Sequence, residues 1–255
     1  MIEFGLIGYP LNNTFSKDFY AERFKKLGLS NHVYKNFPLS SLEDFEPLLK
    51  QSDTFGGFNV TIPYKQSIIT YLNTLSDEAM ACNAVNCIKM VYHYEHKKYF
   101  LKGYNTDVYG FEQSFKPLLN DLHKNSQALI LGSGGAAQAV IFILKKLGIR
   151  YKIASRKLKT PNCIPYSAIT EDVIVNHLMI INCTPLGMYP NIESKPDIPY
   201  QFIGKHHLCY DLVYLPVETA FLNACTNREA ITKNGLEMLQ LQAEKNLEIW
   251  LSNEF

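Results

Sequence analysis

The sequence has no surplus of charge of either sign. Twenty-five lysine and arginine residues stand against 24 aspartate and glutamate residues, which gives a formal net charge of +1. A surplus of positive charge is what draws a protein to nucleic acids and anionic membranes. The composition therefore favours neither as a partner and leaves small neutral or weakly anionic ligands open.

Long hydrophobic runs are also missing. The longest apolar runs, such as residues 139–144, fall far short of the roughly 18 residues that a membrane-spanning helix needs. The first ten residues carry Glu3 and have neither the basic region nor the small-residue cleavage site of a secretion signal. We therefore expect no membrane partner and a cytoplasmic location.

Metal-ligand and disulfide patterns are equally scarce. The six cysteines include no C-x-x-C pair and are diluted in a large chain, which favours reduced, mostly buried thiols over disulfides. Neither His93 and His96 nor His206 and His207 have cysteine or acidic partners at zinc-ligand spacing. We predict no metal site.

The 255 residues suffice for one large or two modest domains. In the first half, expected strands alternate with amphipathic stretches that predict helices, which favours a mainly parallel sheet with helices on both faces. The strands are expected at 3–8, 32–37 and 55–63, and the helices at 16–28 and 41–50. Residues 83–91 and 98–104 flank a polar tip and predict an antiparallel hairpin.

The second half repeats the alternation with more hydrophobic strands. We expect strands at 127–135, 150–155, 178–185 and 207–214, and a helix after the first of them that Gly148 closes. Residues 236–251 carry apolar residues at helical spacing over a length that can bridge two domains. Because no flexible linker separates the halves, we expect them to share an interface with a cleft.

A glycine-rich turn stands between the strand and the helix of this second half. In a dinucleotide-binding fold such a turn lets the backbone approach a pyrophosphate, and the helix N-terminus attracts the phosphate charge. The residues concerned are Gly132, Ser133, Gly134, Gly135 and Ala136. The alternative is a purely structural turn.

The end of the next strand bears on the choice of cofactor. An NAD site usually has an acidic residue there, about 20 residues after the glycines, whereas the 2′-phosphate of NADP needs cations and hydroxyls. Ser155, Arg156 and Lys157 occupy this position, so NADP is the predicted cofactor. Alternatively, Arg156 and Lys157 are solvated loop charges.

Two polar clusters are candidates for substrate binding. Asn59 and Thr61 alternate on one side of an apolar strand, and Lys65 follows just beyond Pro63. Lys65 could equally be a surface lysine after a turn. Residues 105–107 (Asn-Thr-Asp) form the second cluster, which could instead only cap the helix that follows.

Together these motifs resemble shikimate dehydrogenases. The resemblance covers essentially the whole chain, and it is most specific at GFNVTIPYK and GYNTD, which pair a lysine with an aspartate. The motifs in chain order are GYPLNNTFS, GFNVTIPYK, ACNAVN, GYNTD, GSGGAA, SRK, INCTPLGM, YDLVYLP and NGLEMLQLQA.

The resemblance implies an α/β protein of two domains with the active site in the cleft between them. Residues 1–104 plus 236–255 are then the substrate-binding and catalytic domain, and residues 105–235 a Rossmann-type NADP-binding domain. Lys65 and Asp107 are the implied catalytic pair. The implied substrate contacts are Thr14, Ser16, Asn59, Thr61, Asn86, Tyr214 and Gln242. The implied cofactor contacts are the glycine turn (Gly132, Ser133, Gly134, Gly135, Ala136), Ser155, Arg156, Lys157, Leu212 and Gly235.

The implied reaction is the reversible, NADP-dependent reduction of 3-dehydroshikimate to shikimate, which belongs to aromatic amino acid biosynthesis. The enzyme is expected to be a monomer or a homodimer. Two alternatives remain: a quinate/shikimate dehydrogenase of mixed specificity and a non-catalytic NADP-binding sensor. The retained Lys65, Asp107, Asn86 and Gln242 argue against a sensor.

The chain departs from the family pattern in three places. The family's opening motif usually reads serine-x-serine-proline, whereas this chain has Thr14 and Ser16 followed by lysine. The family's NADP motif commonly opens with asparagine and has threonine after the arginine, whereas this chain has Ser155 and Lys157 at these positions. The crossover helix after it is expected to be truncated here, because Pro161 and Pro165 interrupt the segment.

Overall fold

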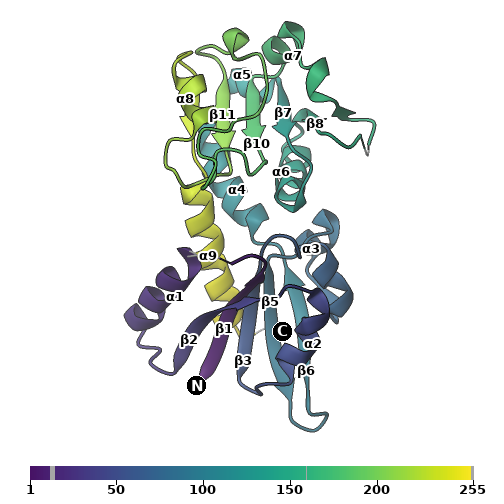
Figure 1. Ribbon diagram of the computed structural model, residues 1–255, viewed down its shortest axis with the longest axis vertical. Helices are drawn as coiled ribbons and strands as arrows, with labels where there is room; N and C mark the ends of the chain where they lie inside the picture. The colour runs from purple at the N-terminus through teal and green to yellow at the C-terminus, as the bar shows by residue number, and fades with distance from the viewer. Residues whose placement is uncertain (12–14, 159, 254–255) are drawn as a thin grey trace. The chain divides into compact units, whose positions relative to one another are not determined.

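The computed structural model describes residues 1–11, 15–158 and 160–253. The chain divides into two compact units, each with its own six-stranded sheet. Unit 1 comprises Met1–Thr106 and Ala243–Phe255, and unit 2 comprises Asp107–Gln242. The sequence-based division lies after residues 104 and 235, whereas the units divide after Thr106 and within the last helix. Figure 1 shows the elements of both units.

Unit 1 contains a mainly parallel sheet in the order β2-β1-β3-β5-β6-β4. Only β5 runs antiparallel to its neighbours, and it forms with β6 the hairpin expected from the sequence. The strands are β1 (Ile2–Gly8), β2 (His32–Pro38), β3 (Phe55–Val60), β4 (Thr74–Leu75), β5 (Cys87–His93) and β6 (Lys98–Tyr104). The helices are α1 (Phe15–Lys26), α2 (Phe45–Leu49) and α3 (Asp77–Cys82), with short 3₁₀ turns at Leu42–Asp44 and Ser67–Tyr71.

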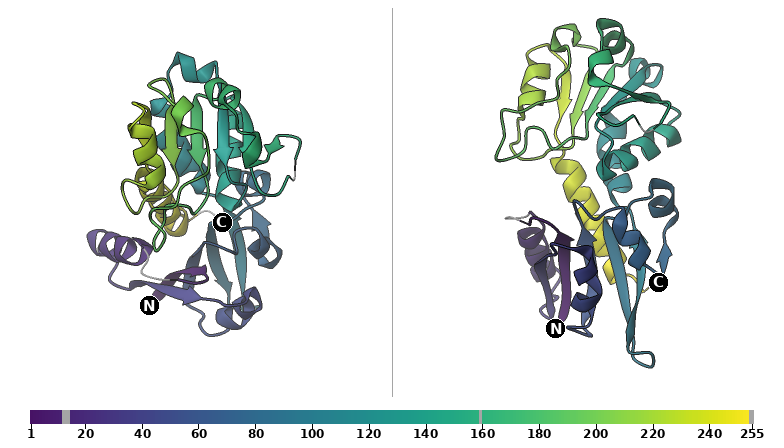
Figure 2. Two further views of the ribbon diagram at one scale, coloured as in Figure 1. Left: turned by 45° about the horizontal axis from the view of Figure 1, so that its top comes forward. Right: turned by 45° about the vertical axis from the view of Figure 1, so that its right-hand side comes forward.

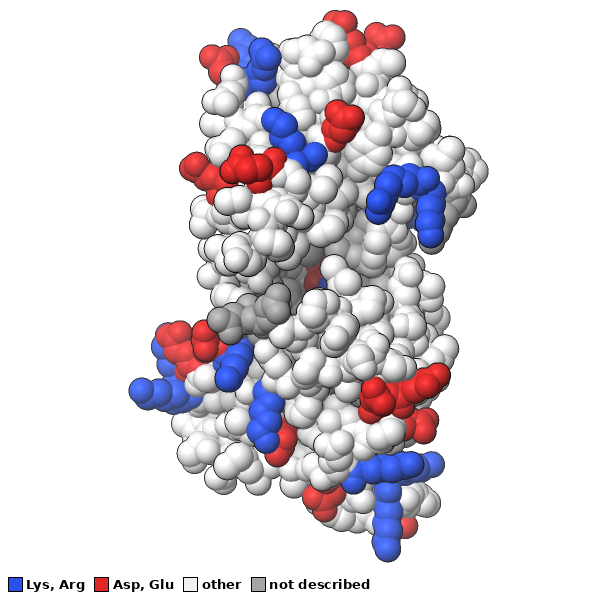
Figure 3. Space-filling model, in the orientation of Figure 1, with Lys and Arg blue, Asp and Glu red and all other residues white. Residues whose placement is uncertain are grey.

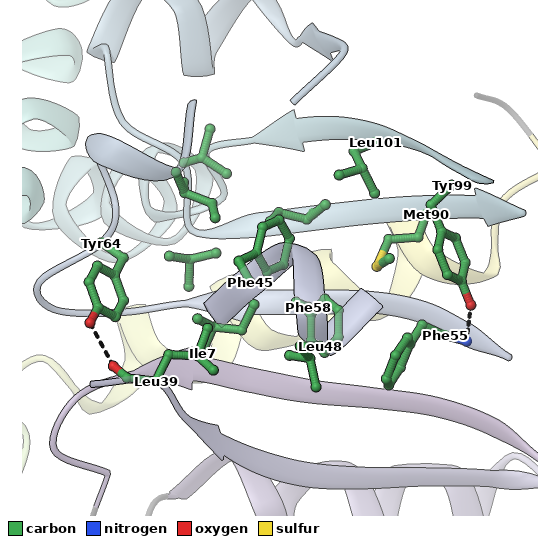
Figure 4. Packing of buried hydrophobic residues seen from close by; sticks show 14 of the residues in the cluster. Ile7, Leu39, Phe45, Leu48, Phe55, Phe58, Tyr64, Met90, Tyr99 and Leu101 are labelled. Carbon is green, nitrogen blue, oxygen red and sulfur yellow. Dashed lines mark hydrogen bonds between the residues drawn. The ribbon is translucent and has the colours of Figure 1, made fainter. Parts of the chain in front are cut away.

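The core of unit 1 lies on both faces of its sheet. On one face, Phe45 and Phe58 are fully buried among side chains of β1, β3, β5 and β6, and Figure 4 shows this packing. Two tyrosine hydroxyls take part there: Tyr64 donates to the carbonyl of Leu39 (2.6 Å), and Tyr99 accepts from the amide of Phe55 (2.7 Å). The polar ends of these aromatic side chains are thus satisfied inside the core.

The C-terminal helix α9 (Leu236–Leu251) covers the other face of this sheet with its last turns. The Trp250 indole donates to the carbonyl of Ile88 (3.0 Å) and lies against Gly57, where an added Cβ would overlap it. Beyond the helix, the buried Lys89 ammonium donates to the backbone and side-chain oxygens of Ser252 (2.6 and 2.7 Å). A cation at a helix C-terminus is favourable for the helix dipole. These contacts hold the last turns of α9 and Ser252 on the sheet of unit 1.

Unit 2 contains a fully parallel sheet in the order β12-β11-β10-β7-β8-β9 with helices on both faces, as in a Rossmann-type fold. Figure 2 shows this sheet from two further sides. The strands are β7 (Gln127–Leu131), β8 (Arg150–Ala154), β9 (Cys163–Ile164), β10 (Met179–Asn182), β11 (Leu208–Asp211) and β12 (Ile231–Lys233). The helices are α4 (Asp107–Phe115), α5 (Asp121–Lys124), α6 (Gly135–Lys146), α7 (Glu171–Asn176) and α8 (Ala220–Thr226), besides α9. Short 3₁₀ turns lie at Lys116–Leu118, Tyr166–Ala168 and Tyr200–Phe202.

The crossover from β8 to β9 differs from the others in unit 2. Its described residues, 155–158 and 160–162, form no helix, in agreement with the truncation expected from Pro161 and Pro165. Gly148, with φ at +69°, follows α6 as the expected helix stop. The strands of unit 2 are short and buried, and Leu129, Ile130 and Ile180 have no exposed surface.

Side chains of both charges lie on the face of the molecule shown in Figure 3. On the face shown in Figure 3, basic and acidic side chains among the described residues are interspersed over each unit. Within residues 1–11, 15–158 and 160–253, no helix combines the length and the hydropathy that a membrane span needs.

Candidate active site

The predicted substrate residues Ser16 and Asn59 are linked in unit 1 through a buried tyrosine. The Tyr34 hydroxyl donates to Asn59 Oδ1 (2.7 Å), and the Ser16 side chain hydrogen-bonds with the same phenol. Burial raises the pKa of Tyr34 well above its usual value, so the phenol keeps its proton. Asn59 Nδ2 in turn faces the carbonyl of Asn86 (3.4 Å).

Asn86 is fixed by Thr106, the residue before Asp107. Asn86 Oδ1 accepts from the Thr106 backbone amide (2.7 Å), and Asn86 Nδ2 donates to Thr106 Oγ1 (3.0 Å). Both residues are buried. Because both ends of the amide are engaged, its orientation is set before any ligand binds.

The hydrogen-bonded chain continues from Thr106 to two helices of unit 1. Thr106 Oγ1 donates to Asn246 Oδ1 (2.5 Å) on α9, and Asn246 Nδ2 donates to the Tyr20 hydroxyl (3.2 Å) on α1. The Tyr20 hydroxyl then donates to the carbonyl of Ala243 (3.2 Å). The sequence reasoning missed Tyr20, Tyr34 and Asn246, because each looks like an ordinary helix or strand residue until the fold brings them together.

Lys65 lies in the turn after β3 and is half-buried. Its carbonyl accepts from the amide of Val85 (2.7 Å), the residue before Asn86. Thr61, at the start of the same turn, donates its amide to Ile7 and accepts from the amide of Tyr64 (both 2.9 Å). The backbone of this turn is therefore held independently of the lysine ammonium. Thr14, the remaining predicted substrate residue of this half, lies outside the described residues.

In unit 2, Asp107 and Gln242 lie on two helices whose backbones touch. Asp107 is the first residue of α4 and is buried. One turn later, a Cβ added to Gly110 would meet the carbonyl of Met238 at 2.5 Å and Gln242 Cβ at 3.1 Å on α9. Only glycine allows this close approach, which sets the first turn of α4 against the turn of α9 that carries Gln242.

The glycine turn has the geometry that a dinucleotide phosphate needs. Gly132 adopts a φ of +100°, and a Cβ there would meet Thr184 Cγ2 at 2.9 Å. Helix α6 begins at Gly135, and its N-cap residue, Gly134, supplies no capping side chain. Because the N-cap residue has no side chain that could accept from the first amides of this 12-residue helix, a phosphate oxygen can fill that role.

The predicted 2′-phosphate residues stand next to this turn. Ser133 Oγ and Ser155 Oγ are 2.8 Å apart, and Ser155 Oγ also accepts from the Lys157 amide (3.2 Å). Arg156 and Lys157 are exposed at the end of β8. A hydroxyl and two cations without an acidic residue at this position fit the phosphate of NADP.

The last predicted cofactor residues meet beside β11. Gly235 packs against the carbonyl of Leu212, where an added Cβ would overlap it, and the Gly235 amide donates to the carbonyl of Val213 (3.1 Å). Tyr214, a predicted substrate residue, follows on the same loop, is half-buried, and has its pKa raised by burial. Residues 1–11, 15–158 and 160–253 contain no cluster of three or more histidine, cysteine or acidic side chains that could hold a metal ion.

Comparisons with known proteins agree on one family. Residues 6–88 match the family model described as the shikimate dehydrogenase substrate binding domain. The chain is 34% identical to the shikimate dehydrogenase (NADP(+)) of Methanococcus aeolicus, over 96% of this chain and 90% of that protein. It also matches the crystal structure of shikimate dehydrogenase 1 from Peptoclostridium difficile, with a TM-score of 0.83 and 33% identity over 100% of this chain and 93% of that one. A Thermus thermophilus shikimate 5-dehydrogenase in complex with NADP(H) and shikimate matches with a TM-score of 0.81 and 27% identity, over 98% and 93% of the two chains.

Proposed function

Because this chain belongs to the shikimate dehydrogenase family, we propose that it is an NADP-dependent oxidoreductase that reversibly reduces 3-dehydroshikimate to shikimate. The reaction serves the pathway to chorismate and the aromatic amino acids. The relatives are named for this activity with NADP(+), and one related structure holds NADP(H) and shikimate together.

The observation that carries the proposal concerns Val85 and Asn86. Lys65 is bonded through its carbonyl to Val85, and Thr106, directly before Asp107, is bonded twice to Asn86. Two neighbouring residues thus anchor the segment of the proposed proton donor and the segment that leads into its aspartate partner. Such backbone anchoring is what a positioned acid and its orienting carboxylate require.

In reduction, Lys65 donates a proton to the ketone oxygen of the substrate. Asp107 orients the ammonium group and accepts a hydrogen bond from a substrate hydroxyl. NADPH, when bound, supplies the hydride. The positive charge of Lys65 also stabilises the negative charge that develops on the ketone oxygen, so one group serves as acid and as electrostatic stabiliser.

The remaining unit 1 residues hold the hydroxylated ring of the substrate. Asn86, Asn59, Thr61 and Ser16 supply the polar side chains of this set. Thr14, Tyr214 and Gln242 complete the proposed substrate set. Because amides and hydroxyls both donate and accept, they suit a ligand with several hydroxyl groups.

Unit 2 would hold the cofactor. The amides at the start of α6 and the glycine turn from Gly132 to Ala136 would bind the pyrophosphate, and Ser155, Arg156 and Lys157 the 2′-phosphate. Leu212 and Gly235 would border the nicotinamide. We assign unit 1 to the substrate and unit 2 to NADP, and we propose a cytoplasmic monomer or homodimer.

The test is an absorbance assay at the reduced-nicotinamide band with shikimate or quinate and with NADP or NAD, in all four combinations. Turnover is expected with shikimate and NADP. Comparable turnover with quinate would make the protein a quinate/shikimate dehydrogenase. NADP binding without turnover in any combination would leave a sensor of the same fold and refute the proposed activity.

A further inference from the structure

Asp211, the last residue of β11, is a fully buried carboxylate with three hydrogen-bond donors. Oδ1 accepts from Asn182 Nδ2 (2.9 Å) and from the Val213 backbone amide (3.0 Å). Oδ2 accepts from the Thr219 hydroxyl at 2.6 Å, a length typical of a charge-assisted bond. The three donors come from β10, from the loop after β11 and from the N-cap of α8.

The bond to Asn182 extends this arrangement into the loop after β10. Asn182 pairs with Asp211 across the two strands, and its Oδ1 accepts from both the amide (3.0 Å) and the hydroxyl (2.6 Å) of Thr184. Thr184 Oγ1 accepts in turn from the Leu186 amide (3.3 Å). Thr184 Cγ2 is the atom closest to the Cβ position of Gly132 in the glycine turn.

Two loops therefore depend on one carboxylate. The loop after β11 contains Leu212 and Tyr214, and the loop after β10 lies against the glycine turn. Both follow the carboxyl ends of parallel strands, where ligands bind in folds of this type. Gly187 of the loop after β10 also packs against Thr219, whose Cβ lies 3.3 Å from the Cβ position of this glycine.

Packing alone does not explain a carboxylate at this position. A buried charge costs free energy unless it is paired or fully hydrogen-bonded, and the three partners of Asp211 are all neutral. A carboxylate differs from an amide in that it accepts from every donor and donates to none. Three converging donors therefore fit the ionised form.

We propose that Asp211 is a positioning residue for NADP binding, which holds the loops after β10 and β11 in the shape that receives the nicotinamide half of the cofactor. The inference rests on the proposed function, since it assumes that NADP is the ligand of unit 2. Asp211 acts through Asn182, Thr184, Val213 and Thr219.

Protonation of Asp211 weakens its hydrogen bonds with Asn182, Val213 and Thr219 within an experimentally accessible pH range. Burial raises the pKa of Asp211 to about 6, against the lowering effect of its three hydrogen bonds. Burial chiefly, and the charge of Asp211 in addition, raise the pKa values of the Cys183 thiol and the Tyr200 phenol, so both stay neutral. Below pH 6 the carboxyl group carries a hydrogen among three donors, and the loops lose a shared acceptor.

The test is the dissociation constant of NADP, measured by calorimetry on the intact protein and on Asp211→Asn. At pH 7.5 we expect the variant to bind NADP at least tenfold more weakly. If only the protein with ionised Asp211 binds NADP, a pKa of about 6 predicts that the dissociation constant of the parent rises about fourfold between pH 7.5 and 5.5. The ratio of the variant's constant to the parent's constant then falls about fourfold. The 2′-phosphate titrates near the same pH, but it affects both proteins and cancels in the ratio.

Tyr210→Phe is the matched control for a loss of stability. Tyr210 precedes Asp211 on β11, is fully buried, and shares a 2.7 Å hydrogen bond with Ser114. This variant should bind NADP like the parent over the whole pH range. If Asp211→Asn does not fold, Thr184→Val tests the same arrangement, because it removes the hydroxyl that donates to Asn182. Thr184→Val should then weaken NADP binding, whereas Thr184→Ser, which keeps the hydroxyl, should bind NADP like the parent.

Equal NADP affinity in the parent and in Asp211→Asn would overturn the proposal. So would a constant ratio across pH, or an equal loss in Tyr210→Phe, since either result indicates a structural role only. If Asp211→Asn does not fold, unchanged NADP affinity in Thr184→Val would overturn it as well. A parent protein that binds NADP but turns over no substrate would refute the proposed function without affecting this comparison.

Discussion

Replacing Lys65 by methionine tests proton transfer separately from folding. Methionine keeps much of the apolar side chain and removes the ammonium group. The turn around residue 65 is held by the backbone bond from Val85 to the Lys65 carbonyl and by the bond from Tyr64 to Leu39. Neither bond involves the lysine side chain, so the variant is expected to fold.

The expected loss is that of a positioned general acid. Such groups contribute ~10²–10⁴ in rate, which corresponds to about 3–5 kcal/mol of transition-state stabilisation. We expect the turnover number of Lys65→Met for 3-dehydroshikimate to fall by a factor of ~10²–10⁴ or more. The dissociation constant of NADP should stay within about twofold, since the binding of the cofactor is assigned to unit 2.

The assay is the oxidation of NADPH under saturating and limiting substrate. If the ammonium acts mainly in the transition state, kcat and kcat/KM fall together; a rise in KM alone indicates ground-state binding. Lys98→Met is the control, because Lys98 is exposed and begins β6, whereas Thr106 follows the other end of that strand. A folded Lys65→Met protein that works at close to the parent rate would refute the mechanism.

Three further variants test the cofactor site and the two cores. Arg156→Ala should raise the KM for NADP about tenfold and leave that for NAD unchanged, because it removes a charge-assisted bond to the 2′-phosphate; equal effects on both cofactors would contradict the assignment. Gly57→Ala should destabilise unit 1 by about 1–3 kcal/mol, because the added Cβ overlaps the Trp250 indole. Trp250 is the only tryptophan, so a shift in its fluorescence reports the displacement directly, and an unchanged spectrum and melting temperature would argue against the packing. Burial lowers the pKa of His177, so stability is lost as the pH falls through about 6.5, the value of an unperturbed histidine. His177→Leu should reduce the drop in melting temperature between pH 7 and 5.5, and a drop as large as that of the parent would count against this cause.

Local sequence patterns predicted the elements that carry a strong periodic signal. The helix predicted at 236–251 matches the bounds of α9. The hairpin of β5 and β6 and the strand, glycine turn and helix from β7 to α6 were also predicted, because alternation, helical spacing and glycine position act over a few residues. The short strands β4, β9 and β12 were missed, since two or three residues are too few to show a period.

The family resemblance provided the candidate residues, but the hydrogen bonds between them depend on residues far apart in the chain. Asn246 meets Thr106 and Tyr20 only because α9 returns to unit 1. Nothing in the local sequence marks Asn246 as more than one polar residue on a helix.

Asp211 shows the same division between sequence and tertiary structure. The sequence by itself determined that Asp211 lies within a buried strand, expected at 207–214, and that the chain resembles a known family. Whether the carboxylate is exposed, paired or buried depends on β10, on the turn after β11 and on the cap of α8. Such contacts are set by how elements distant in sequence pack, because hydrogen-bond partners are chosen by position in space. Only the tertiary structure decided that Asp211 is hydrogen-bonded to the loop after β11 and, through Asn182, to the loop after β10, at the carboxyl ends of these strands.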